Sequence, residues 1–330
     1  MFERIRWGLV STAHINRSVI PAIRAARHSQ LSAVASRSLE QARAYAAEWE
    51  IPRAFGSYEA MLADPDIEAV YISLPNSLHS EWAVKAMQAG KHVLCEKPLA
   101  TTLPAVDAII AAQRQTGKVA AEAFMYRHHP QTLKVREIVA SGALGKIQLL
   151  RGSFTFHLTN PANIRLNAEL HGGSLWDIGC YPLSYTRTAL GLEPEEVFAW
   201  QVESSSGVDE SLCGTLRFPG NIYAQILCSF NSPYSAGVEI LGDEGQLLIP
   251  DPYKPGTKSE IILRRDGQTE TIPFESQELY QGEVEDLVDA ILTGKAPRIS
   301  LADSRSNVAA ILALLESARQ NRPVQLSAVG

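Results

Sequence analysis

Hydrophobic and polar positions in the first third of the chain alternate between two patterns. Short apolar runs are separated by longer stretches in which apolar residues recur every three or four positions. The predicted strands are IRWGLV (5–10), QLSAVAS (30–36), AVYISL (69–74), HVLCE (92–96) and VAAEAF (119–124). A helical stretch follows each of the first four. This alternation is typical of a parallel sheet with helices on both faces.

The pattern changes after about residue 124. Strand-like segments now follow one another with Gly, Asn, Pro or Asp turns between them and few helical spacers, which predicts a largely antiparallel sheet. These segments are 146–157, 196–204, 211–218, 221–230, 237–242 and 245–250. Two helices are predicted at 281–294 and 300–321, and Ser300 or Asp303 is the candidate N-cap of the second.

The length of 330 residues exceeds what one hydrophobic core usually supports. We therefore predict a doubly wound α/β Rossmann domain over residues 1–123. An α+β domain with a large, mostly antiparallel open sheet follows over residues 124–330. Ligands of open α/β sheets bind beyond the carboxyl ends of the strands. The residues that follow each strand are therefore the candidates for a site.

Composition narrows the function classes. With 45% hydrophobic residues, 20% charged residues and a net charge of −6, the chain has no general attraction to nucleic acid or to anionic membranes. No apolar run reaches the ~18 residues of a membrane span, and MFERIRWGLV lacks the pattern of a secretion signal. The four cysteines, Cys95, Cys180, Cys213 and Cys228, form no CxxC pair. We expect a cytoplasmic protein whose cysteines are small buried side chains, with no metal.

The turn after the first predicted strand reads STAHIN, residues 11–16. A dinucleotide-binding loop has the pattern G-x-G-x-x-G/A between a strand and a helix, because glycines let the backbone approach the pyrophosphate. Here Ser11, Ala13 and Asn16 occupy the three glycine positions. Taken alone, the turn fits a phosphate cradle and an ordinary strand-to-helix connection equally well.

The end of the second predicted strand has no acidic residue before Glu40. A site that prefers NAD usually places Asp or Glu here, where it binds the adenosine ribose hydroxyls. The residues present are Ser36, Arg37 and Ser38, and a guanidinium between two hydroxyls suits the 2′-phosphate of NADP. Given a cofactor, this favours NADP; the alternative for Arg37 is a solvated loop arginine.

Polar residues also follow the next two long strands. In LPNSLH (74–79), Asn76 offers donors and an acceptor, either for a ligand or for capping the next helix. In EKP (96–98), Glu96 and Lys97 come directly after a buried strand. Lys97 either faces a ligand at the carboxyl edge of the sheet or forms a structural ion pair with Glu96.

A third motif, HGGSLWDIGCYP (171–182), lies in the second predicted domain. Asp177 and Tyr181 are four residues apart, which places both on one face of a helix. The residues between and before them are mostly apolar, so this helix is expected to be largely buried. The alternative is a solvated helix face, and His171 is another polar candidate nearby.

In order along the chain, STAHIN, LPNSLH, GKHVLCEKPLA, EAFMYRHHPQ and GGSLWDIGCYP resemble the family that contains glucose-fructose oxidoreductase, inositol dehydrogenase and the MocA-like proteins. The resemblance spans essentially the whole chain. Many members have a histidine acid/base where this chain has Tyr181. The tyrosine resembles the branch with glucose-fructose oxidoreductase, dimeric dihydrodiol dehydrogenase and NADP-dependent D-xylose dehydrogenases.

The resemblance implies that Lys97, Tyr181 and Asp177 are catalytic. Oxidising a carbinol requires a base for the hydroxyl proton while a hydride leaves. A phenol with an ordinary pKa near ~10 is a weak base at neutral pH, and a nearby ammonium lowers that pKa. Lys97 would supply this charge, and Asp177 would position either partner.

The same resemblance implies the binding residues. The pyrophosphate would be held by Ser11, Thr12, Ala13, His14 and Ile15, and the 2′-phosphate by Ser36 and Arg37. The ribose and nicotinamide would be lined by Leu74, Asn76, His79, Glu96 and Lys97. The substrate would contact Phe154, Arg165, Trp176 and Tyr181, although Phe154 also fits a core position. For the phosphate loop we expect negative φ at Ser11 and Ala13, with the amides of residues 12–15 facing the pyrophosphate.

Together these features predict an NADP-dependent oxidoreductase, with NAD as the other cofactor considered. It would transfer a hydride between the nicotinamide and a carbinol or carbonyl of a sugar, polyol or cyclic diol. The alternatives are a non-enzymatic NAD(P)-sensing regulator, as in a repressor of galactose genes, and an NAD-dependent glycosidase. The resemblance also implies a homodimer or homotetramer formed through the C-terminal sheet.

Overall fold

The structure, a computed structural model, describes residues 4–256 and 259–326. It contains two compact units. The first unit combines residues up to 125 with residues 278–305, and the second combines residues 126–277 with those from 306 onward. The segment 278–305, which the sequence pattern assigns to the second domain, thus belongs to the first. Its helix α8 (Gln281–Thr293) buries Val284, Leu287 and Val288 and contacts elements of the first unit.

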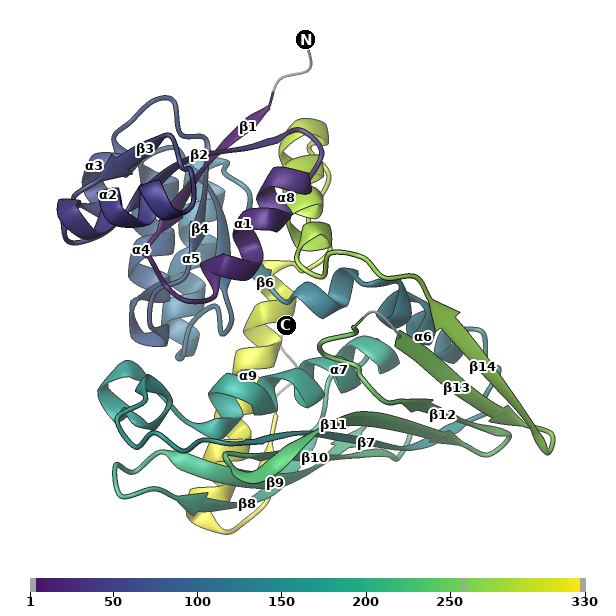
Figure 1. The fold of residues 1–330 in the computed structure, drawn as a ribbon. Helices are drawn as coiled ribbons and strands as arrows, with labels where there is room; N and C mark the ends of the chain where they lie inside the picture. The colour runs from purple at the N-terminus through teal and green to yellow at the C-terminus, as the bar shows by residue number, and fades with distance from the viewer. Residues whose placement is uncertain (1–3, 257–258, 327–330) are drawn as a thin grey trace. The chain divides into compact units, whose positions relative to one another are not determined.

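A six-stranded, all-parallel sheet forms the centre of the first unit (Figure 1). Its strands are β1 (Ile5–Val10), β2 (Ser29–Ala35), β3 (Arg53–Phe55), β4 (Ala69–Ile72), β5 (His92–Glu96) and β6 (Ala120–Ala123). The spatial order is β3-β2-β1-β4-β5-β6, so the direction of winding reverses between β1 and β4. This confirms the predicted doubly wound sheet. Strand β3 was not predicted, because three half-buried residues give no apolar run.

Helices cover both faces of this sheet. They are α1 (Asn16–Ala25), α2 (Leu39–Glu48), α3 (Tyr58–Leu62), α4 (His79–Gln88), α5 (Leu103–Thr116) and α8. Because crossover connections are right-handed, reversing the winding direction puts the later helices on the opposite face. Accordingly, α1 contacts α8, and α4 contacts α5 (Figure 1).

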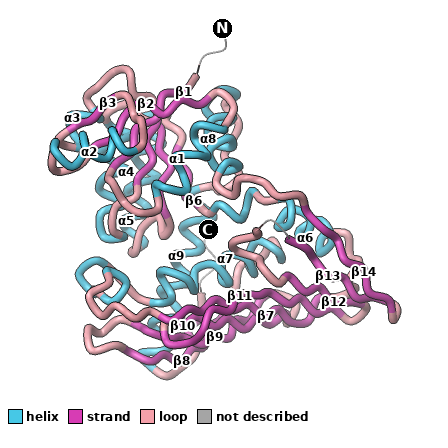
Figure 2. Tube along the Cα trace, viewed as in Figure 1, coloured by secondary structure: helices cyan, strands magenta, loops and turns pink. Residues whose placement is uncertain are grey.

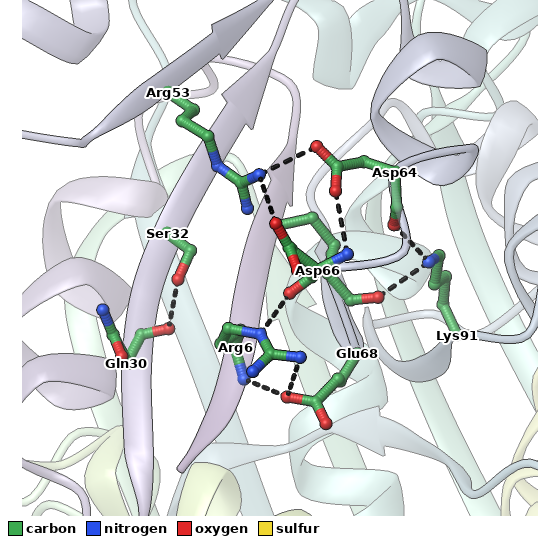
Figure 3. Close-up of polar contacts among 9 residues, drawn as sticks. Arg6, Gln30, Ser32, Arg53, Asp64, Asp66, Glu68 and Lys91 are labelled. Atoms are coloured by element: carbon green, nitrogen blue, oxygen red, sulfur yellow. Dashed lines mark hydrogen bonds and ion pairs between the residues drawn. The ribbon is translucent and has the colours of Figure 1, made fainter.

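A cluster of charged residues ties together the amino-terminal ends of these strands (Figure 3). Arg53 forms ion pairs with Asp64 (2.8 Å) and Asp66 (3.5 Å). The ammonium of Lys91, which is buried, donates to the carbonyl oxygens of Asp64 and Ile67 at 2.6 and 2.7 Å. The cluster therefore fixes the loop before β4 at the sheet edge opposite to the one where ligands bind.

The second unit contains a nine-stranded sheet in the described residues. Its strands are β7 (Ile147–His157), β8 (Glu196–Glu203), β9 (Asp209–Phe218), β10 (Ile222–Ser229), β11 (Asn231–Gly242), β12 (Gly245–Ile249), β13 (Ser259–Arg265), β14 (Gln268–Phe274) and β15 (Val324–Gln325). The order is β14-β13-β12-β11-β7-β10-β9-β8-β15, and only the β7/β10 pair is parallel. This confirms the mostly antiparallel sheet.

Helices lie along one face of the second sheet (Figure 2). They include α6 (Pro130–Ala140), the π-helical turn η5 (Leu175–Gly179), α7 (Cys180–Leu190) and most of α9 (Leu301–Gln320). Ser300 accepts a hydrogen bond from the Asp303 amide (3.1 Å) and thus caps α9, as predicted. Cys213 is exposed, so the expectation that every cysteine is buried was wrong for this residue. None of the described helices has both the length and the apolar character needed to cross a membrane.

Candidate active site

The turn after β1 corrects one prediction. Ser11 has φ +107°, in the region that favours glycine, where a negative value was expected. Its hydroxyl oxygen lies 2.9 Å from Ser73 Oγ and accepts from the Ala13 amide at 3.1 Å, and its carbonyl accepts from Asn16 Nδ2 at 2.8 Å. Such a conformation costs about 1–3 kcal/mol, and three hydrogen bonds of about 0.5–1.5 kcal/mol each are of the size needed to hold it.

The remaining features of this turn fit an anion site. Ala13 has negative φ, as predicted. In the described part of the chain, the amides of Thr12, His14 and Ile15 donate to no protein acceptor, whereas the Ala13 amide is taken by Ser11. These amides lie at the start of α1, where the helix dipole favours negative charge. The residues present therefore fit a pyrophosphate, with one amide fewer than expected.

Of the three polar residues that follow β2, only Arg37 has a side chain that is not engaged within the turn. Ser36 is buried and donates to Gln41 Oε1 at 3.3 Å, and Ser38 caps α2 by accepting from the Gln41 amide, also at 3.3 Å. Arg37 is exposed and, among the described residues, forms no ion pair. The two serines thus shape the turn, and Arg37 is the member of the trio free to meet an anion.

The loop after β4 is held by a buried histidine. His79 Nε2 lies 2.7 Å from the Leu74 carbonyl oxygen, and Nδ1 lies 2.7 Å from the Pro98 carbonyl oxygen. Burial lowers the pKa of this imidazole. Each ring nitrogen faces a backbone carbonyl oxygen, one in the loop after β4 and one in the loop after β5. His79 therefore links these two loops and has no ring nitrogen left for a ligand. Leu74 is buried, and Asn76 is half-buried at the start of a short 3₁₀ turn (Asn76–Leu78).

Three contacts fix the loop that carries Lys97. The Tyr71 hydroxyl donates to Glu96 Oε1, the Lys97 amide donates to Glu96 Oε2 (3.2 Å), and the Leu99 amide donates to buried Glu122 (2.8 Å). The Lys97–Pro98 peptide bond is cis. Lys97 is half-buried and directly follows β5, at the carboxyl edge where it was predicted.

A buried carboxyl group that the sequence did not single out lies near this loop. Glu283, on α8, is 2% exposed, and neither carboxyl oxygen has a partner among the described residues. Burial, with a further contribution from Glu96, raises its pKa well above the usual range. The same burial and the charges of Glu96 and Glu283 raise the pKa of Tyr280.

In the second unit, the HGG motif starts a continuous helix with an irregular first turn. Gly173 has φ +123°, and residues 175–179 form a π-helical turn before α7. The Cys180 amide accordingly bonds to the Leu175 carbonyl, and Pro182 has no N–H to donate to the Ile178 carbonyl. The sequence predicted a regular helix here. π-Helical turns of this kind often lie at functional sites.

Tyr181 lies in an aromatic cluster that also contains Tyr126, Phe154 and Tyr253. The ring of Tyr181 is 5.5 Å from Phe154, 5.6 Å from Tyr253 and 5.8 Å from Tyr126, measured between centroids. Phe154 is 3% exposed and stacks on Tyr253, which supports the core interpretation of this residue. The cluster fixes the orientation of the Tyr181 ring, which is itself 5% exposed.

Asp177 pairs with Arg165. Arg165 Nε donates to Asp177 Oδ2 at 2.5 Å, and both side chains are partly exposed. Trp176, next to Asp177, is buried, and His171 is exposed in a left-handed conformation. Four predicted residues, Arg165, Trp176, Asp177 and Tyr181, thus come from one helix and the loop before it. No three His, Cys, Asp or Glu side chains of the described chain form a metal-binding group.

A doubly wound parallel sheet with a phosphate-type turn after β1 is typical of dinucleotide-binding proteins, and here a large, mostly antiparallel sheet follows it along the chain. Residues 5–124 match the model of the oxidoreductase family with an NAD-binding Rossmann fold, and residues 132–248 match the GFO/IDH/MocA C-terminal domain. The chain belongs to this family and is an NAD(P)-dependent oxidoreductase.

The relatives include D-xylose 1-dehydrogenase (NADP(+)) 2 from Haloferax volcanii, which is 38% identical over 97% of this chain and 99% of its own. Among solved structures, the aldose-aldose oxidoreductase from Caulobacter crescentus, complexed with glycerol, has a TM-score of 0.90 at 28% identity, covering 98% of this chain and 100% of its own. KijD10, a 3-ketoreductase from Actinomadura kijaniata in complex with NADP and TDP-benzene, also has a TM-score of 0.90, at 29% identity and with 96% and 98% covered.

Proposed function

We propose that the protein is an NADP-dependent dehydrogenase or reductase that acts on a carbinol or carbonyl carbon of a sugar or of a related polyol or cyclic diol. One observation carries the proposal. The chain has Lys97, Asp177 and Tyr181 at the positions implied by the resemblance, and it is 38% identical to an NADP-dependent D-xylose dehydrogenase along nearly its whole length. A sensor that performs no chemistry would not need this set of residues.

In the proposed mechanism, the chemistry that NADP would supply when bound is the transfer of a hydride to or from its nicotinamide. The Thr12, His14 and Ile15 amides in the turn after β1 would hold the cofactor's pyrophosphate, and Arg37 would hold the 2′-phosphate. Tyr181 takes the proton from the substrate hydroxyl in oxidation and returns it in reduction. The Lys97 ammonium favours the ionised phenol and the developing alkoxide. The Asp177–Arg165 pair orients substrate hydroxyls beside Tyr181.

The test is a panel of aldoses, polyols and cyclic diols, each assayed with NADP⁺ and NAD⁺ at the absorbance band of the reduced nicotinamide. We expect turnover with at least one aldose and with NADP⁺ preferred. Glycoside cleavage without net nicotinamide reduction would favour the glycosidase alternative. Tight NADP binding with no turnover across the panel would favour the sensor.

Arg37 is expected to determine the cofactor preference. Arg37→Ala removes the charged donor to the 2′-phosphate, so KM for NADP⁺ should rise about 10- to 100-fold, the range of a charge-assisted hydrogen bond. KM for NAD⁺, which lacks that phosphate, should change less than twofold by the same argument. The matched control is Arg43→Ala, because Arg43 is also an exposed arginine but lies on α2, after the turn. An equal rise in KM for both cofactors would contradict the assignment.

We further propose that the outer face of the second sheet joins copies of this chain. Trp200, Cys213 and Leu227 are aligned across β8, β9 and β10, and Trp200 and Leu227 are 59% and 43% exposed. The same face forms a concavity of about 610 Å³ that includes Cys213 and Leu227. An exposed apolar surface on a sheet whose other face carries helices is typical of a subunit interface.

Leu227→Lys is therefore expected to reduce the mass in solution from that of a dimer or tetramer to that of a smaller assembly. The reason is that a lysine buried between two apolar faces would lose its hydration. Light scattering coupled to size-exclusion chromatography measures the mass. Leu292→Lys, on α8 of the first unit and similarly exposed, should leave it unchanged. A wild-type protein that is already monomeric at micromolar concentration would refute the interface.

A further inference from the structure

A buried carboxylate from a different strand holds the start of the helix that carries Tyr181. Asp209, the first residue of β9, accepts hydrogen bonds at Oδ2 from the Ser174 hydroxyl (2.6 Å) and from the Leu175 amide (2.7 Å). Ser174, which precedes the π-helical turn η5, makes no capping bond of its own to the helix. Asp209 therefore serves as the N-cap of this helix from 35 residues further along the chain.

The surroundings of Asp209 are tightly closed. Asp209 is 4% exposed, and in the described chain no lysine, arginine or histidine lies within ion-pair distance of its carboxylate. A Cβ on Gly173 would lie 2.3 Å from Asp209 Oδ1, so glycine is what allows the carboxylate to approach the helix. The charge is held by the hydrogen bonds from the Ser174 hydroxyl and the Leu175 amide, with further contributions from the backbone of Ser174 and of Asp209 itself, and by the positive end of the helix dipole. Any change at Asp209 is thus transmitted directly to residues 173–175.

The helix has little freedom to absorb such a change. Gly179 approaches β10 so closely that a Cβ there would lie 2.7 Å from Cys228 Sγ. Ser174 Oγ, the first of the two donors, is also 3.3 Å from the same sulfur atom. Trp176 and Asp177 lie between these two fixed points, and Tyr181 follows within one turn of Gly179. Releasing the Asp209 end therefore displaces Trp176 and Asp177 first.

We propose that Asp209 is a positioning residue. In its ionised form it anchors the start of the helix that presents Trp176, Asp177 and Tyr181, and its protonation in mildly acidic solution loosens the anchor and slows turnover. The effect on turnover rests on the proposed function, because it assigns chemistry to Asp177 and Tyr181.

The titration of Asp209 falls in an accessible range. Burial raises the pKa of its carboxyl group to about 6, although the hydrogen bonds from Ser174 and Leu175 act in the opposite direction. Above this pH the ionised group accepts both bonds; below it, the protonated group is a weaker acceptor and carries no charge for the helix dipole. Turnover should therefore fall as the pH decreases through about 6.

The other titratable groups near Asp209 lie on β10, on β8 and β9, and on the helix with the loop before it. On β10, the Cys228 thiol has a pKa raised well above its usual range by burial, so it stays neutral. Glu203, opposite Asp209 on β8, is exposed, and Glu210 binds Asn231 Nδ2 at 3.0 Å. On the helix and the loop before it, Arg165 and Asp177 pair with each other.

The kinetic test compares pH profiles of kcat for the wild type, Asp209→Asn and Ser174→Ala. Wild-type kcat should rise about tenfold from pH 5 to pH 7.5, the factor expected when a hydrogen bond becomes charge-assisted. Asp209→Asn should remove this inflection and keep kcat near the wild-type value at pH 5. Ser174→Ala removes a bond that lowers the pKa of Asp209, so its inflection should move to higher pH.

Glu210→Gln, at the neighbouring and less buried carboxylate, is the control and should retain the wild-type profile. An inflection that persists in Asp209→Asn, or one that does not move in Ser174→Ala, would overturn the proposal. The Ser174 variant decides the question even where the Asp209 variant fails to fold.

Amide hydrogen exchange tests the anchor without any substrate. At pH 7.5, peptides covering residues 174–181 should exchange faster in Asp209→Asn than in the wild type, and at pH 5 the two proteins should exchange alike. Peptides from α8 should show no difference at either pH. Equal protection of residues 174–181 at pH 7.5 would refute the anchor. Faster exchange without turnover on any substrate would instead refute the proposed function and leave the anchor intact.

Discussion

Tyr181→Phe is expected to lower kcat about 10²- to 10⁴-fold, the usual contribution of a general acid/base. The phenylalanine ring preserves the contacts with Phe154 and Tyr253, so the aromatic cluster and the fold should remain. Only the hydroxyl to which we assign the proton exchange with the substrate is lost. The affinity for NADP(H), which the first unit provides, should stay within about twofold, because the variant removes no group that we assign to the cofactor.

Steady-state turnover of the best panel substrate and fluorescence titration of NADPH measure these two effects. Tyr185→Phe is the matched control, because Tyr185 lies one turn further along α7, is fully buried and also contacts Tyr126. Its kcat should remain near wild type. Lys97→Ala should also lower kcat severely, because it removes the ammonium to which we assign the stabilisation of the ionised phenol and the developing alkoxide. Wild-type turnover in both Tyr181→Phe and Lys97→Ala would reject the mechanism.

The elements that the sequence predicted are those whose burial leaves a local pattern. Strands such as AVYI (Ala69–Ile72) are buried on both faces and read as continuous apolar runs, so the parallel sheet was evident. β14 is mostly exposed, and its residues QTETIPF give no such run. Helix α8 was predicted with nearly correct ends, but the unit on which it packs is a tertiary property that its own amphipathic pattern does not specify.

In the candidate site too, features with a local sequence pattern could be predicted, and features that depend on distant residues could not. Residues directly after strands, such as Arg37 and Lys97, could be singled out from the sequence because strand ends define the ligand edge of the sheet, and their roles stay predictions. The positive φ of Ser11 was missed, because it depends on Ser73 and Asn16, and the contact with Ser73 spans 62 positions of sequence. Asp209 was missed for a similar reason, since nothing near it in the sequence shows that its carboxylate caps a helix that starts at Leu175.

Gly173→Ala is expected to abolish most turnover and to lower the free energy of unfolding of the second unit by about 2–4 kcal/mol. Two effects combine: φ of +123° is a conformation that alanine rarely adopts, and the added Cβ would lie 2.3 Å from Asp209 Oδ1. Either the carboxylate or the start of the helix must move, and both arrangements displace Asp177. Denaturant titration followed by tryptophan fluorescence, together with kcat, measures the result.

Gly191→Ala separates the two causes, because Gly191 also has positive φ (+64°) at the other end of α7 but has open space where a Cβ would be placed. Its cost should be about 1 kcal/mol, with kcat unchanged. Introducing Gly173→Ala into an Asp209→Ala background should cost less than introducing it into the wild type, because the clash is absent and only the backbone strain remains. An equal cost in both backgrounds would show that the carboxylate does not limit the space at Gly173. In that case the close approach of Asp209 to the helix would not be what requires glycine at this position.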